Sequence, residues 1–360
     1  MKQFFKASLI IILLINLVSC SEKMMDDKEK EALKISIKAD ITHHLQDAHD
    51  FHLFTMKDEH GHDKHYGFPL PVILIDGGLK VFMSSKFHHG HAIAESGGAY
   101  YKLSHGKIYK TEASGKLIPD GHGHFENEMP MDVSITKSVF STMMIVLLIF
   151  FLFKKVGKSY GTSLIPRGFG KIAEPLVLFV RDEIAIPNIG EKKYKKYMPY
   201  LLTVFFFIWF INLSGLTPLG INVTGNIAVT TSLAILTFII TTASGNKNYW
   251  KHIFWMPGVP TPMKIILAPI ELLGVLIKPF ALLIRLYANI SAGHIVLMSL
   301  IGLLFVFQNV FARGAFFGLT IFLSLIELLV AFLQAYIFTM LSALYFGMAV
   351  EEHDHEEGHH

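Results

Sequence analysis

The sequence predicts an all-α, polytopic membrane protein with about five transmembrane helices, the last two long and tilted. An N-terminal extracytoplasmic extension, partly β and rich in histidine, precedes them. Of the 360 residues, 52% are hydrophobic and 30 are phenylalanine, and the mean hydropathy is positive. This composition is too apolar for a soluble chain of this length. Thirteen of the 19 histidines lie between His43 and His124, in a segment without a long apolar span.

The first 20 residues are similar to a bacterial lipoprotein signal peptide. Lys2 and Lys6 precede an apolar run, which ends in Leu17-Val18-Ser19-Cys20. This pattern predicts cleavage of residues 1–20, lipidation of Cys20 and export of the segment that follows. An uncleaved N-terminal anchor is the alternative. Because Cys20 is the only cysteine, an intramolecular disulfide is excluded.

Residues 21–133 form the predicted extracytoplasmic domain. Two passages are typical of β-hairpins: PVILIDGGLKVFMSS, with a turn at Asp76-Gly77-Gly78, and KIYKTEASGKLI, with a turn around Ser114-Gly115. Histidine clusters such as His60, His62, His65 and His122, His124 are a possible Zn²⁺ or Cu²⁺ site. Without cysteines or regular spacing, we favour a solvated, pH-responsive surface and predict no metal.

The membrane domain is predicted over residues 134–350. A first span at 135–153 is followed at once by Lys154 and Lys155, which orient it from outside to inside. The loop 154–198 carries ten lysines and arginines, so we expect it in the cytoplasm, with an interfacial segment. The second and third spans, 199–216 and 227–242, flank an outer loop without lysine or arginine.

Two long apolar segments, 263–307 and 314–350, complete this domain. Each exceeds the roughly 20 residues of a perpendicular span, so tilt, a kink or an interfacial course is expected. Pro279 is one place where the first could bend. By alternation, the acidic and histidine-rich tail at 351–360 is cytoplasmic.

Polar residues within these two segments are candidates for a transport path. At about 100° per residue, one helix face carries Glu271, Lys278, Arg285 and Asn289, and His294 points to the opposite face. On the last helix, Glu327 and Gln334 share a face. Intramembrane ionisable residues usually mark pathways, although helix packing through an ordinary polar pair is the alternative.

The passage LLIRLYANISAGH resembles subunit a of the F-type ATP synthase, the membrane stator of its Fo motor. The family pattern Arg-Leu-x-x-Asn-x-x-Ala-Gly matches Arg285, Leu286, Asn289, Ala292 and Gly293. The passage LQAYIFTMLSALYFGMAVEEH also matches, as do Lys278-Pro279, Glu271 and the Asn212-Leu-x-x-Leu-x-Pro218 loop. The resemblance covers about residues 134–352.

The resemblance implies a proton-conducting subunit with two half-channels, no cofactor and no enzymatic activity of its own. Protons would enter from outside past Glu327 and His294, neutralise a carboxylate on the c-subunit ring, and leave near Glu271. Arg285 would separate the channels and attract the deprotonated carboxylate, with Asn289 and Gln334 as polar support. The implied partners are the c ring, the b-subunit peripheral stalk, the other synthase subunits and membrane lipid, with no nucleic acid. The implied location is the bacterial inner membrane, with the N-terminal domain periplasmic.

The sequence departs from the family pattern at two places, and two other classes of function are weighed against this interpretation. Many bacterial relatives have an acid at His294 and a histidine at Glu327, so the residue types are exchanged, and Gly215 replaces an acidic residue of the outer loop. A stand-alone ion or metal transporter would use the histidine-rich domain as a collector, but no inverted repeat is evident. A membrane-bound enzyme is disfavoured by the lack of an HExxH, P-loop or nucleophile motif.

Overall fold

A computed structural model describes residues 27–45, 47–57, 63–90, 92–120, 125–161, 168–217, 221–256, 259–307 and 309–351. The chain divides into two compact units. The larger contains residues 47–290 and 331–360, and the smaller contains residues 1–46 and 291–330. The predicted signal peptide with Cys20, the histidines at 60, 62, 122 and 124, and the end of the tail lie outside the described residues.

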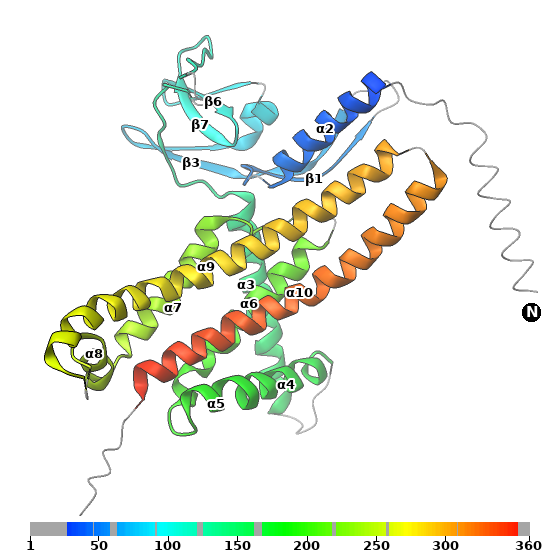
Figure 1. Ribbon diagram of the computed structural model, residues 1–360. Coiled ribbons are helices and arrows are strands. Elements are labelled where there is room, and N and C mark those ends of the chain that lie inside the picture. The colour runs from blue at the N-terminus through cyan, green and yellow to red at the C-terminus, as the bar shows by residue number, and fades with distance from the viewer. Residues whose placement is uncertain are drawn as a thin grey trace, which may run out of the picture. The chain divides into compact units, whose positions relative to one another are not determined.

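Antiparallel strands make up the N-terminal part of the larger unit (Figure 1). Their pairing gives three small sheets, ordered β1-β2, β4-β3-β8 and β5-β6-β7. A buried apolar cluster that includes Val72, Leu74, Phe87 and Tyr101 joins the second and third sheets. The elements are β1 (Asp50–Lys57), β2 (Asp63–Pro69), β3 (Pro71–Ile75), β4 (Leu79–Met83), the 3-10 helix η2 (Ser84–Gly90), β5 (Ile93–Ser96), β6 (Ala99–Ser104), β7 (Lys107–Thr111) and β8 (Met131–Asp132).

The first predicted hairpin is confirmed, and the second is wrong. β3 and β4 pair across Asp76-Gly77-Gly78, where both glycines have positive φ. A turn does close at Gly115, whose N–H donates to Glu112. However, β7 pairs with β6 through the turn at His105-Gly106, and the segment after Gly115 forms no strand with it. The apolar residues after Gly115 therefore do not form a strand that pairs with β7.

Asp76 ties the β3–β4 turn to the third sheet. Its carboxylate accepts hydrogen bonds from Lys110 Nζ and Tyr101 Oη, each at 2.9 Å. The bonds from Lys110 and then Tyr101 lower the pKa of the Asp76 carboxyl. Burial and the bond to Asp76 raise the pKa of Tyr101 to about 12. The ionised carboxylate is thus stabilised by folding.

This arrangement predicts an acid-sensitive contribution to stability. Because the folded-state pKa of Asp76 is lowered, its stabilisation is present above the unfolded pKa of about 3.9 and lost as the pH falls through the folded value. We expect Asp76→Asn to have a lower unfolding temperature at neutral pH and a weaker acid dependence than the wild type. Thermal unfolding of the full chain in detergent tests this, with the exposed Glu126→Gln as control. An acid dependence in Asp76→Asn equal to that of the wild type would contradict the assignment.

Asp47 connects the N-terminal strands to two membrane helices of the same unit. Its Oδ1 accepts the N–H of Ser138 at 3.0 Å, in the first turn of α3 (Lys137–Tyr160). Its Oδ2 accepts the side-chain amide of Asn226 at 3.0 Å, and Asn226 is the N-cap of α7 (Ile227–Ala243). A carboxylate is favourable at a helix N-terminus. One side chain thus satisfies groups at the beginnings of two helices.

Removing this carboxylate should weaken the junction. We expect Asp47→Ala to cost about 1 kcal/mol, the usual value of a helix-capping contact, and Asp47→Asn to cost less because it keeps one acceptor. Denaturation of the purified chain in detergent measures both. Equal stability of Asp47→Ala and wild type would show that the two bonds contribute nothing net.

Among the described residues, four helices are long and apolar enough to cross a membrane. They are α3, α6 (Tyr194–Gly215), α9 (Thr261–Val306) and α10 (Val310–Val350). α7 and α8 (Lys247–Phe254) bend by 103° and pass the same test only as a pair, which would give a fifth span. The prediction of a mostly helical membrane chain with a strand-containing N-terminal region is confirmed. Its extracytoplasmic location stays a prediction.

The predicted third span is short. α7 has 17 residues, and α8 follows after the break. The described part of the basic segment between the first two spans is largely helical, and its interfacial position stays a prediction. It contains α4 (Gly170–Phe179), the π-helix η3 (Val180–Ala185) and α5 (Ile186–Ile189).

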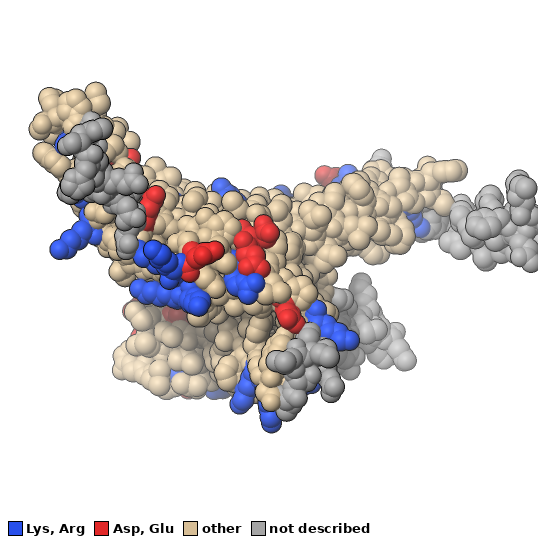
Figure 2. Space-filling model, turned by 90° about the horizontal axis from the view of Figure 1, so that it is seen from below, with Lys and Arg blue, Asp and Glu red and all other residues tan. Residues whose placement is uncertain are grey.

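On the face drawn in Figure 2, charged side chains gather in a few groups, with wide uncharged areas between them.

α9 and α10 are too long to cross a bilayer at a right angle. Their 46 and 41 residues correspond to about 69 and 62 Å of helix, against a hydrocarbon core of about 30 Å. Pro269 and Pro279 lie inside the continuous α9. Both helices, drawn as long ribbons in Figure 1, must therefore be strongly inclined or run partly along the interface if they enter the bilayer.

The carboxyl end of α10 is fixed within the larger unit. Val350 O accepts hydrogen bonds from Lys193 Nζ at 2.8 Å and Asn246 Nδ2 at 3.0 Å, and Ala349 O accepts the N–H of Asn246 at 2.9 Å. A Cβ on Gly347 would overlap the carbonyl oxygen of Asn188. These contacts satisfy carbonyls that a helix end leaves without partners.

The smaller unit consists of α2 (Asp27–Leu45) and the parts of α9 and α10 on either side of their short connection. Gly302 of α9 lies against Ile37 of α2, and a Cβ at Gly302 would come within 2.6 Å of the isoleucine Cγ2. Arg313 Nε donates to Phe307 O at 2.9 Å and closes the connection between α9 and α10. The two long helices are thereby held as an antiparallel hairpin.

Candidate functional site

Arg285 lies on the open face of α9. Leu282, Leu286 and Ile290, at helical spacing, are buried at 1, 1 and 5% exposure, whereas Arg285 and Asn289 are exposed. Because positions four apart share a helix face, the leucines fix which side of α9 packs inward. Among the described residues, no hydrogen bond or ion pair engages the guanidinium of Arg285. The charge is available to a group outside this chain.

Towards its N-terminus, the polar stripe of α9 meets the C-terminal half of α10. Lys278 Nζ lies 5.5 Å from the ring centroid of Tyr345 and 3.8 Å from Met348 Sδ. Glu271 is close enough to act electrostatically on Lys278, and Arg285 on Tyr345. Tyr345 thus lies near two members of the predicted stripe, Lys278 and Arg285.

A small, mainly apolar cavity with a few polar groups adjoins this stripe. It has a volume of about 10 Å³, roughly the space of one water molecule. Its polar groups come from Thr237 and Thr241 of α7, Tyr249 of α8, Lys278 and Tyr345. Sequence reasoning missed these threonines. Their signal was the repeat of buried threonines at 230, 237 and 241, which all lie on one face of α7.

Gln334 is also in the larger unit and is 3% exposed. Among the described residues, no hydrogen bond joins it to Arg285, so the polar support expected from Gln334 stays a prediction. Asn212 is buried and accepts a bond from Thr224 Oγ1 at 2.8 Å, while its Nδ2 has no partner among the described groups. Asn226 has a structural role as the N-cap of α7.

His294 and Glu327 belong to the smaller unit, on α9 and α10 respectively, and both are half-buried. No hydrogen bond or ion pair joins them in the described part of the chain. Instead, the carboxylate of Glu327 lies directly against Gly293, the residue before His294, in space that a Cβ would occupy. The glycine thus lets the acid approach the backbone of α9 next to the histidine.

No group of three or more histidine, cysteine, aspartate or glutamate side chains capable of holding a metal occurs among the described residues. The histidine clusters considered for Zn²⁺ or Cu²⁺ fall largely on residues outside that set.

A family model described as ATP synthase A chain matches residues 139–347, which include the polar groups of α7, α9 and α10. The chain belongs to this family. It is a subunit a of an F-type ATP synthase, a membrane subunit that is not an enzyme by itself. A second model, described as a domain of unknown function, matches residues 40–133, the strand-containing region.

Relatives over the membrane region agree. ATP synthase subunit a 2 of Chlorobaculum tepidum is 44% identical over 237 residues, which are 63% of this chain and 66% of the relative. Subunit a of Chloroherpeton thalassium is 43% identical over 64% of this chain and 70% of the relative. Subunit a of Myxococcus xanthus is 46% identical over 64% of this chain and 77% of the relative. The similarity thus covers about two thirds of the chain.

Proposed function

We propose that this subunit a is the proton-conducting stator of the Fo motor and that Arg285 separates its two half-channels. The supporting observation is an exposed guanidinium without a hydrogen bond or ion pair to any described residue, on a helix whose adjoining face is packed through Leu282 and Leu286. A charge at a helix centre costs about 2.5 to 3.5 kcal/mol on insertion scales, so it is retained for a purpose. The group that fits it is a carboxylate carried by another polypeptide, the ring of c subunits.

The inner half-channel passes Glu271. Support for this route comes from Lys278 and Tyr345, which lie beside a water-sized cavity on the way to Arg285. The hydroxyls of Thr237 and Thr241 donate to backbone carbonyls of α7, and their oxygens can accept a hydrogen bond from a water. A carboxyl group on the ring loses its proton into this route.

The outer half-channel passes His294 and Glu327. A half-buried carboxyl group and imidazole on neighbouring helices suit proton entry, because imidazole can exchange protons at physiological pH. Asn289 and Gln334 support the passing ring carboxylate by hydrogen bonding. The histidine and glutamate favour protons over sodium ions as the transported species.

The topology follows the positive-inside rule. Residues 1–20 are a signal peptide with Cys20 as the lipidation site, residues 21–133 are periplasmic, residues 134–350 are the bacterial inner-membrane domain, and residues 351–360 are a cytoplasmic tail. The b-subunit peripheral stalk holds the subunit against the turning ring, and the wide apolar surface contacts lipid.

Purification separates this function from that of a stand-alone transporter. A tagged chain should copurify with the c ring and the catalytic head. When the chain alone is reconstituted in liposomes, its proton flux should not reach that of the intact complex. Robust, ligand-driven transport by the isolated chain, without a ring, would refute the stator assignment.

The outer pair gives a sharper prediction. Exchanging both residues, His294→Glu with Glu327→His, keeps one carboxyl and one imidazole on the outer route. We therefore expect the double variant to retain more proton-driven ATP synthesis than His294→Ala or Glu327→Gln. The measurement is synthesis by inverted or reconstituted membranes at matched amounts of assembled complex. If the double variant is no better than the worse single variant, the two residues do not act as a pair.

A further inference from the structure

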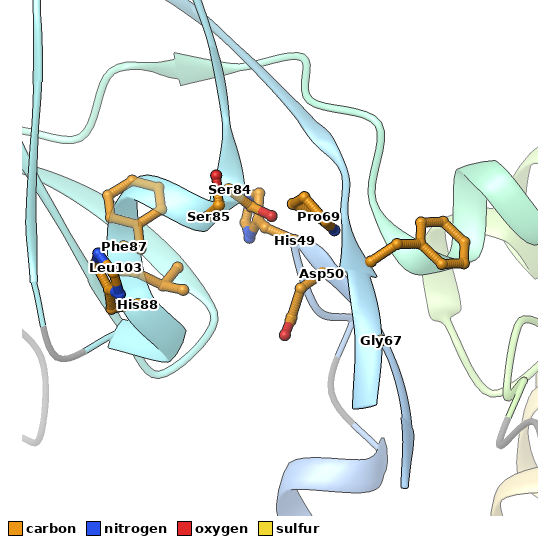
Figure 3. A pocket seen from close by; sticks show the side chains of 10 residues that line it. His49, Asp50, Gly67, Pro69, Ser84, Ser85, Phe87, His88 and Leu103 are labelled. Carbon is orange, nitrogen blue, oxygen red and sulfur yellow. The ribbon is translucent and has the colours of Figure 1, made fainter. Parts of the chain in front are cut away.

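The strand-containing region holds a cavity of about 230 Å³ that the stator function does not use. It lies between the β1–β2 hairpin and the segment η2, with Leu103 of β6 completing the wall (Figure 3). Pro69, Phe87 and Leu103 give it an apolar lining, and His49 and Ser84 add polar groups. A mainly apolar cavity with a few polar groups is the usual form of a small-molecule site.

His49 is the polar group that distinguishes this cavity. It is 3% exposed, and its Nε2 lies 2.7 Å from Asp132 Oδ2. Burial alone would raise the pKa of Asp132, but hydrogen bonds from His49 and Ser134 outweigh it and lower that pKa. The ionised carboxylate therefore accepts the proton on Nε2. In a neutral imidazole this leaves the lone pair on Nδ1.

Nδ1 of His49 is buried and has no hydrogen-bond partner among the described residues. Buried polar atoms in native proteins are nearly always hydrogen-bonded, so an exception calls for an explanation. Figure 3 shows the imidazole between Ser84 and Pro69 on the cavity wall. A donor held in the cavity beside this ring would supply the missing bond.

We propose that the cavity binds a small, neutral aromatic molecule with one N–H or O–H group, which donates to His49 Nδ1. An apolar cavity of about 150 Å³ accommodates benzene, so 230 Å³ is sufficient for a ligand of one or two rings. The lone pair of Nδ1 and the nearby carboxylate of Asp50 both disfavour an anion. No described cluster of ligating side chains points to a metal.

Indole and 1-methylindole test this proposal, because they differ mainly in the N–H donor. Calorimetric titration of the full-length protein in detergent should give saturable binding, with indole at least about fivefold tighter, the difference expected of one hydrogen bond. His49→Phe keeps a ring but removes both nitrogens, so it should bind the two ligands equally. Leu103→Trp and Ser85→Phe fill the cavity from different sides and should abolish saturable binding of both.

Thermal unfolding of each variant checks that it is folded, and having two cavity-filling variants guards against the failure of one. Absence of saturable indole binding to the wild type would overturn the proposal. Equal affinities of the two ligands for the wild type, or a preserved preference for indole in His49→Phe, would also overturn it, because each outcome removes His49 from recognition. Unchanged binding in both folded cavity-filling variants would place the ligand elsewhere.

Discussion

Replacing Arg285 by alanine is expected to abolish proton-driven ATP synthesis while the complex still assembles. The side chain is exposed and makes no hydrogen bond or ion pair with a described residue, so its loss leaves the packing through Leu282 and Leu286 intact. What disappears is the fixed charge that attracts a deprotonated ring carboxylate. We expect synthesis to fall by at least about a hundredfold, equivalent to about 2.7 kcal/mol.

Two companion measurements make this result specific. Arg285→Lys should also fail, because lysine retains a charge but lacks the planar fork that binds a carboxylate through two bonds, and its ammonium can lose a proton. Membranes with Arg285→Ala should leak protons through the assembled Fo sector, since the barrier between the half-channels is gone. Copurification of the ring is the control for assembly. Normal synthesis by either assembled variant would remove Arg285 from the proposed role.

The sequence was sufficient to predict most of the membrane architecture, because that architecture follows from composition along the chain. Long apolar runs, the lysines at 154 and 155, and the loop without basic residues define the spans and their order. The exposed face of α9 could also be predicted, since Arg285 and Asn289 are four residues apart. The spans and the exposed face of α9 depend only on the residues near them in the sequence.

Tertiary pairing could not be predicted in the same way. β7 has the same strand-forming residues whichever neighbour it joins, and its pairing with β6 depends on the turn at His105-Gly106. The bond from Thr224 to Asn212 and the two bonds of Asp47 join residues far apart in the sequence. Position-by-position patterns contain no signal for such contacts. The cavity beside His49 is invisible in the sequence for the same reason.

The contact between Gly293 and Glu327 leads to the second large effect. The Glu327 carboxylate occupies the space beside Gly293, so Gly293→Ala forces the acid to move or the helices to separate. Because the overlapping atoms belong to the side-chain end of Glu327, reorientation of the carboxylate is the cheaper response. We therefore expect a stable, assembled complex whose ATP synthesis is reduced about tenfold or more, a barrier increase of about 1.4 kcal/mol.

Shortening the acid should relieve the overlap. The pair Gly293→Ala with Glu327→Asp removes one methylene where one methyl was added, so it should recover part of the activity lost in Gly293→Ala. Gly157→Ala in α3 is the matched control, because nothing lies within 4 Å of a Cβ at that position. Full activity of Gly293→Ala would mean that the position of the carboxylate against α9 does not matter for proton entry. Loss of assembly in Gly293→Ala, with no rescue by the shorter acid, would make the contact one of helix packing and not of transport.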